Sequence, residues 1–83
     1  MLLENIKDDI KAYIKNTIAK DENLKLENDT LLISSRIIDS ISTLKMVDYL
    51  EKKFNIEFQP HEVDTDNLDS IDLIAQFIAS KIK

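Results

Sequence analysis

Two serines of this chain stand in the same local context, each after an aspartate and before an isoleucine, in Asp39-Ser40-Ile41 and Asp69-Ser70-Ile71. A serine hydroxyl can act as a nucleophile, receive a group from another enzyme, or cap a helix. A nucleophilic serine normally needs a base within reach. The single histidine, His61, lies beside Pro60 in a polar stretch and is expected at the surface. We therefore expect the chain not to be an enzyme.

Metal and disulfide chemistry find little support. The chain has no cysteine, which excludes disulfides and thiolate metal sites. Pairs such as Asp8 with Asp9 and Asp64 with Asp66 could bind a hard cation, but the chain lacks a twelve-residue calcium loop with its glycine. We interpret these carboxylates as a solvated face and expect no metal.

Hydrophobic periodicity predicts the helices that must position the two serines. The first helix spans about residues 3–19 and is followed by a polar loop, whose later part packs on the core. The second should begin near Asp39 or Ser40, because both are good N-cap residues. Its predicted apolar face consists of Ile41, Leu44, Val47, Leu50 and Phe54, with Met46 and Tyr49 at the flanks.

The rest of the chain is predicted to hold one short helical turn and a last helix. Pro60 interrupts the pattern, residues 61–64 could form the turn, and the last helix should begin near Asn67. A strand is not expected, because polar and apolar residues alternate cleanly over no stretch longer than residues 55–58. The sequence thus predicts a single all-α domain over residues 1–83, a bundle with three main helices, one short third helix and a long first loop.

Composition restricts the partners. With 11 Lys and Arg against 16 Asp and Glu, the net charge of −5 disfavours nucleic acid and favours basic protein surfaces. No apolar run approaches the ~20 residues that a membrane span requires, and residues 1–5 lack the features of a secretory signal. We therefore expect a cytoplasmic monomer without a membrane span.

Position distinguishes the two serines. Ser40 has enough chain before it for a helix and a loop, and enough after it for further helices. Only 13 residues follow Ser70, and Leu68, Ile71 and Ile74 fit the start of an ordinary amphipathic helix there. We expect Ser70 to be structural. Without further information, Ser40 would also be interpreted as a helix cap.

The surroundings of Ser40 resemble the attachment site of acyl and peptidyl carrier proteins. In that family an Asp-Ser pair opens the second helix after a long loop, apolar residues follow at the first, fourth and seventh positions, and a phenylalanine closes the helix fourteen residues on. Those places are held here by Ile41, Leu44, Val47 and Phe54. The likeness continues through Glu57-Phe58-Gln59-Pro60 and Asn67-Leu68-Asp69-Ser70-Ile71, and it covers roughly residues 5 to 80.

The resemblance implies a four-helix acyl-carrier-like bundle that carries a covalent 4′-phosphopantetheine arm on Ser40. In the family a separate phosphopantetheinyl transferase deprotonates the serine and delivers the arm from coenzyme A, so a base within the chain is not needed. The arm holds acyl intermediates as thioesters and presents them to ligases and synthases in fatty-acid, polyketide or related biosynthesis. A phosphodiester is also well placed at a helix N-terminus, where unpaired N–H groups meet a partial positive charge.

Three neighbours of Ser40 are candidates for partner recognition. The resemblance implies that Asp39 helps the transferase recognise the serine, while its alternative role is to favour the helix dipole. We expect Ile41 at the edge of the exit path of the arm, with a core role as the alternative. Met46 is expected as a partly exposed contact for partner enzymes, because methionine adapts to varied surfaces, with core filling as the alternative.

The second helix also departs from that of the main fatty-acid carriers. Lys45 replaces a usual acid, Ser42 stands where aspartate is common, and Ile37 replaces a frequent glycine. These differences favour a specialised carrier. Two alternatives remain open: a peptidyl or D-alanyl (aminoacyl) carrier, which differs in the loaded thioester, and a helical protein-interaction domain in which Ser40 is unmodified.

Overall fold

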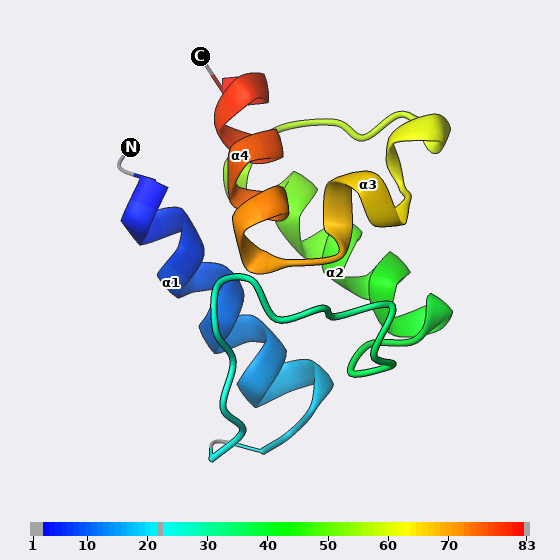
Figure 1. The fold of residues 1–83 in the computed structure, drawn as a ribbon. Coiled ribbons are helices and arrows are strands. Elements are labelled where there is room, and N and C mark those ends of the chain that lie inside the picture. Colours follow the sequence, from blue (N-terminus) through cyan, green and yellow to red (C-terminus); the bar gives the residue numbers. More distant parts are fainter. Residues whose placement is uncertain (1–2, 22, 83) are drawn as a thin grey trace.

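A computed structural model describes residues 3–21 and 23–82 of the chain. These residues form helices and connecting segments and include no strand (Figure 1), which confirms the all-helical fold class. The elements in chain order are α1 (Leu3–Tyr13), a π-helical segment (Ile14–Ile18), α2 (Ser40–Phe54), a 3-10 turn (Pro60–Glu62), α3 (Thr65–Leu68) and α4 (Ile71–Ile82).

The first predicted helix is present, but its last part is wound differently. After α1 the chain continues as the π-helical segment, which the Ala19 N–H closes by donating to the Ile14 carbonyl at 2.8 Å. Lys20 follows with a left-handed backbone, at a φ of 53°. A left-handed residue just past a helix is a common way to end it, because it turns the chain away from the helix axis.

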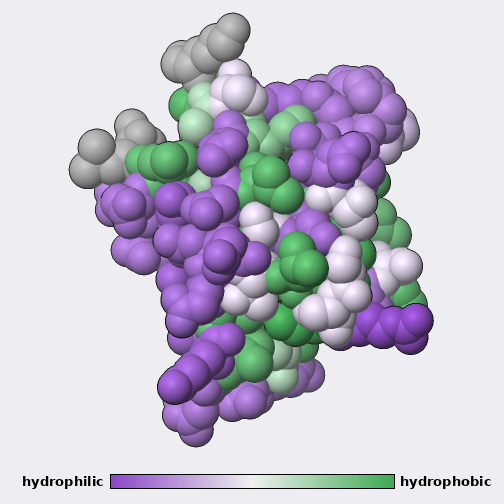
Figure 2. All heavy atoms as spheres, viewed as in Figure 1, coloured by the Kyte–Doolittle hydropathy of each residue, from purple (hydrophilic) through white to green (hydrophobic). Residues whose placement is uncertain are grey.

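Helices α1 and α4 lie side by side, and α2 runs behind α3 in the view of Figure 1. A salt bridge of 2.9 Å between Lys7 and Asp72 joins the first two. The buried apolar side chains of all the main elements form one cluster: Ile6, Ile10, Ile14, Leu26, Leu32, Ile38, Met46, Val47, Leu50, Phe54, Phe58, Leu68, Ile71, Ile74, Ala75 and Ile78. On the face shown in Figure 2, hydrophilic side chains surround a smaller region of apolar ones.

An aromatic pair connects the end of α1 to the middle of α2. The rings of Tyr13 and Tyr49 stack with centroids 4.0 Å apart and planes 12° apart. The Tyr13 hydroxyl also donates to the Lys45 carbonyl at 3.3 Å. Stacking and a satisfied hydroxyl together make this pair a specific contact between the two helices.

The buried face of α2 differs from the predicted one at its first turns. Ile41 and Leu44 are 67% and 62% exposed, whereas Thr43 and Met46 face the core. The predicted apolar face is therefore buried only from Val47 onward, and Leu44 does not share the burial of Leu50 and Phe54. The prediction that Met46 is a partly exposed partner contact is wrong, because its side chain is 0% exposed and fills the core. The cause is a rotation of α2, which places the 43 and 46 positions toward the other helices.

The last predicted helix is divided in two. Residues 60–62 form a 3-10 turn, α3 occupies only Thr65–Leu68, and α4 begins at Ile71 instead of near Asn67. Capping explains the division. The Asp64 carboxylate accepts a hydrogen bond from the Asn67 N–H at 3.1 Å, and the Ser70 Oγ accepts one from the Leu73 N–H at 3.1 Å. Two caps so close in sequence start two separate helices.

Among the residues described, no helix is long and apolar enough to cross a membrane.

Candidate functional site

Ser40 is the first residue of α2, and Asp39 is its N-cap. The Asp39 carboxylate accepts a hydrogen bond from the Ser42 N–H at 2.7 Å, and the Asp39 carbonyl accepts one from the Thr43 N–H at 2.8 Å. The Thr43 hydroxyl donates to the same carbonyl at 2.7 Å. Asp39 thus performs the capping that Ser40 could have performed, and the serine side chain is not needed to start the helix.

The Ser40 side chain is exposed, and within residues 3–21 and 23–82 no hydrogen bond involves its hydroxyl. The predicted alternative, in which Ser40 caps the helix, therefore does not describe this structure. Asp39 is a weak base for the neighbouring hydroxyl, because hydrogen bonds from the Ser42 N–H and hydroxyl lower the pKa of the Asp39 carboxyl. The arrangement offers a reachable hydroxyl without an activating group beside it.

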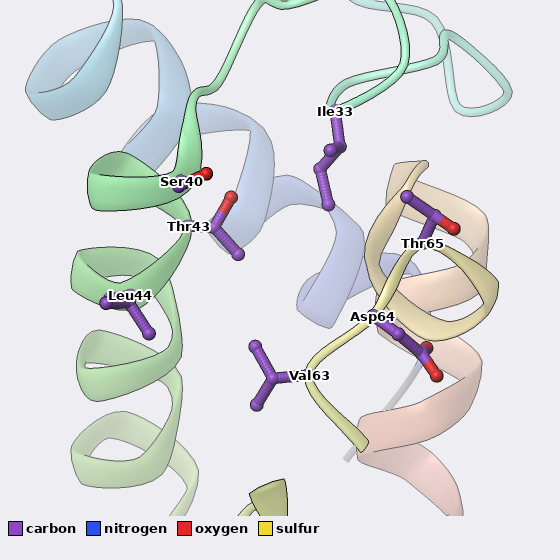
Figure 3. Close-up of a pocket in the computed structure, with 7 residues that line it drawn as sticks. All are labelled: Ile33, Ser40, Thr43, Leu44, Val63, Asp64 and Thr65. Carbon is purple, nitrogen blue, oxygen red and sulfur yellow. The ribbon is translucent and has the colours of Figure 1, made fainter. Parts of the chain in front are cut away.

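A cavity of about 320 Å³ opens beside Ser40, between α2 and the segment that leads into α3. In Figure 3, Thr43 and Leu44 lie on α2, Val63 points toward them from the opposite wall, and Ile33 reaches in from the long loop. The Asp64 carboxylate, which caps α3, points away from α2. The part of the cavity nearest Ser40 is therefore lined mainly by apolar side chains and the Thr43 methyl-bearing side chain.

A second cavity, of about 290 Å³, borders Ser40 on another side. Its lining consists of Ile33, Arg36, Ile38, Asp39 and Ser40. Ile33 lines both cavities, so the loop before α2 forms a wall on either side of the serine. A group attached to the hydroxyl has apolar surface on one side and an arginine on the other.

Two large apolar side chains stand exposed beside the serine, at the start of α2. Ile41 follows Ser40 directly, and Leu44 lies one helical turn further on. Helix positions three apart share a face, so the two side chains form one apolar surface next to the hydroxyl. The exposure of Ile41 rules out the core role that was its alternative, and Leu44 lies on the same face.

The second serine of the repeated tripeptide has the opposite environment. Ser70 is only 6% exposed, and its Oγ accepts the hydrogen bond that caps α4. This agrees with the structural role predicted for it. Its neighbour Asp69 is 7% exposed and is also engaged, because its carbonyl accepts a hydrogen bond from the Leu32 N–H at 2.7 Å.

The carboxylate of Asp69 holds the loop that borders Ser40. One oxygen accepts hydrogen bonds from the N–H groups of Ile33 at 2.8 Å and Ser34 at 2.9 Å. The other accepts the Ser34 hydroxyl at 2.5 Å. Sequence reasoning missed this contact. The only available signal was an aspartate between the apolar residues 68 and 71, where a charge is unexpected in a buried helix start.

The remaining candidates do not join the site. His61 is exposed and lies in the 3-10 turn. In the part of the chain that the structure describes, no three His, Cys, Asp or Glu side chains are grouped so that they could hold a metal ion.

No protein-family model matches the chain, and no curated protein matches it in sequence.

Proposed function

We propose that this protein is a carrier that holds a 4′-phosphopantetheine arm on Ser40 and presents an acyl group, bound to the arm as a thioester, to partner enzymes. The observation that carries the proposal is the contrast between two serines in the same tripeptide. Ser40 is exposed and makes no hydrogen bond that the fold needs, whereas Ser70 is buried and caps a helix.

The capping of α2 by Asp39 and not by Ser40 supports this assignment. Because Asp39 caps α2, the helix start does not depend on the serine hydroxyl, and esterifying that hydroxyl costs no capping bond. The lowered pKa of the Asp39 carboxyl makes its carboxylate a weaker base toward the neighbouring hydroxyl. A separate phosphopantetheinyl transferase would therefore supply the base, take the serine proton and deliver the arm from coenzyme A.

The surroundings of Ser40 also suit partners that must approach the arm. Ile41 and Leu44 supply exposed apolar surface beside the attachment point. Removing such surface from water is the main source of favourable free energy in protein association. We assign Ile41, Leu44 and Asp39 to recognition by the transferase and the loading enzymes, and leave Met46 to the core. The departures at Lys45 and Ser42 favour partners outside core fatty-acid synthesis.

Intact-mass measurement after co-expression with a broad-specificity phosphopantetheinyl transferase tests the proposal. We expect the wild type to gain the mass of one phosphopantetheine, Ser40→Ala to gain none, and Ser70→Ala to gain one. Circular dichroism of each variant establishes that it is folded. An unmodified wild type would refute the carrier function, and an arm on Ser40→Ala would show that another residue is the attachment site.

A further inference from the structure

Arg36 has a backbone conformation that suits glycine better than arginine. Its φ is 66°, in the left-handed region, where a side chain crowds the backbone. The Arg36 N–H closes a turn by donating to the Ile33 carbonyl at 3.0 Å. Strained residues of this kind persist only where the surrounding structure holds them in place, and they are often found at functional sites.

The surrounding structure does hold this turn. The Asp69 carboxylate binds the N–H groups of Ile33 and Ser34 and the Ser34 hydroxyl, which fixes the positions two and three residues before Arg36. On the other side, the Ile38 N–H donates to the Leu32 carbonyl at 3.0 Å. Hydrogen bonds on both sides of Arg36 therefore hold the loop that positions it.

Strain alone does not single out Arg36, because the chain has no glycine and Lys20 is also left-handed, with a φ of 53°. Location does. Arg36 lines the 290 Å³ cavity together with Asp39 and Ser40, whereas Lys20 lines neither cavity at the serine. Within residues 3–21 and 23–82, no salt bridge involves Arg36.

The charges around Ser40 indicate what the Arg36 guanidinium could bind. Asp39 is ionised next to the hydroxyl, and Lys45 is the cation whose charge helps to lower the pKa of that carboxyl. A phosphodiester on Ser40 would add a second negative charge in the same cavity. A guanidinium is well suited to such a group, because its planar N–H donors match the geometry of phosphate oxygens.

We propose that Arg36 binds the phosphodiester of the group esterified to Ser40, and that this contact accounts for an arginine at a backbone position that favours glycine. The inference rests on the proposed function and deepens it, because it assigns a phosphate-binding residue to the attachment site. Arg36 is a binding residue here and takes no part in transferring the arm.

Thermal unfolding of apo and holo proteins tests the proposal, with Arg36→Gly as the main variant and Lys20→Gly as the matched control. Both substitutions relieve a left-handed residue, so we expect each to raise the apo Tm by roughly 3–8 °C. In the wild type and in Lys20→Gly, attaching the arm should raise Tm further, by roughly 2–6 °C at low salt. In Arg36→Gly that second increment should disappear.

Two further measurements sharpen the comparison. The increment in the wild type should shrink as salt is raised toward 0.5 M, since ions screen exposed charges at about this concentration. The ³¹P resonance of the holo protein should shift in Arg36→Gly and stay in place in Lys20→Gly. Arg36→Lys, which keeps the charge without the planar donors, should retain part of the increment.

The outcomes separate the two proposals. If the wild type gains no arm, its unchanged mass overturns the carrier function and this inference with it. If the wild type gains the arm but the apo-to-holo increment is the same in Arg36→Gly, the carrier function stands and the phosphate contact is refuted. A lower apo Tm for Arg36→Gly would refute the claim that arginine is retained there at a cost in stability.

Discussion

Replacing Asp69 should uncouple the loop beside Ser40 from the start of α4. The Asp69 carboxylate accepts three hydrogen bonds from Ile33 and Ser34, at 2.8, 2.9 and 2.5 Å. Hydrogen bonds to a charged group contribute about 1.5–3 kcal/mol each when buried. Ser34 is exposed, so water can replace part of these hydrogen bonds in the variant. We therefore expect Asp69→Ala to lower the free energy of unfolding by about 3 kcal/mol.

That loss is a large share of the protein's free energy of unfolding. A chain of 83 residues has a free energy of unfolding of about 4–12 kcal/mol. Asp69→Asn keeps an acceptor oxygen for the two N–H groups and should lose only about 1–2 kcal/mol, and Ser34→Ala, which removes one bond, about 1 kcal/mol. Urea denaturation followed by circular dichroism gives these values, and amide hydrogen exchange at Ile33 and Ser34 locates the effect.

The pH dependence gives a second test of the same contact. Burial raises the pKa of the Asp69 carboxyl, but hydrogen bonds from the Ser34 hydroxyl and from the N–H groups of Ser34 and Ile33 outweigh it and lower the pKa below its usual 3.8. A lowered pKa in the folded state stabilises the fold above the unfolded value and is lost as pH falls. The advantage of the wild type over Asp69→Asn should therefore shrink below about pH 4.

Two results would refute this account of Asp69. One is an Asp69→Ala variant whose free energy of unfolding lies within about 0.5 kcal/mol of the wild type, which is the range of ordinary surface substitutions. The other is an Asp69→Asn variant as unstable as Asp69→Ala, because the loss would then come from the charge and not from the bonds that hold the loop.

The other predictions concern α2. Met46→Ala should reduce the free energy of unfolding by about 2–5 kcal/mol in urea denaturation, because it opens a cavity in the core, and a loss below 1 kcal/mol would contradict the buried placement. Ile41→Ser and Leu44→Ser should each change stability by less than about 0.5 kcal/mol, because both side chains are exposed. In steady-state assays with the transferase, the same two variants should raise KM with little change in kcat, and unaltered kinetics would exclude them from recognition.

Local chemistry made the start of α2 predictable from sequence. An aspartate before Ser40 and an apolar repeat after it specify both the cap and the helix, and the structure confirms them. The buried face was harder to assign. Positions 41 and 44 continue the apolar repeat of Val47, Leu50 and Phe54 as regularly as positions 43 and 46 do, and the choice between them depends on which neighbours cover the first turns of the helix.

Contacts between distant parts of the chain could not be inferred from the sequence. Asp69 binds residues 35 and 36 positions away in sequence, and no local pattern reports that distance. The same contact lies at the division of the last predicted helix into α3 and α4, since Asp69 binds the loop before α2 and the next residue, Ser70, caps α4. The left-handed Arg36 was also hidden, because a glycine usually marks such a position and this chain has none.

The tyrosine pair gives the protein a built-in spectroscopic reporter. The chain has no tryptophan and only two tyrosines, and both rings lie in the one stack between the end of α1 and α2. Absorbance and fluorescence at wavelengths where phenylalanine is silent therefore arise from that single contact. Any event that separates the first two long helices becomes visible in the unlabelled protein, without a dye or an engineered residue.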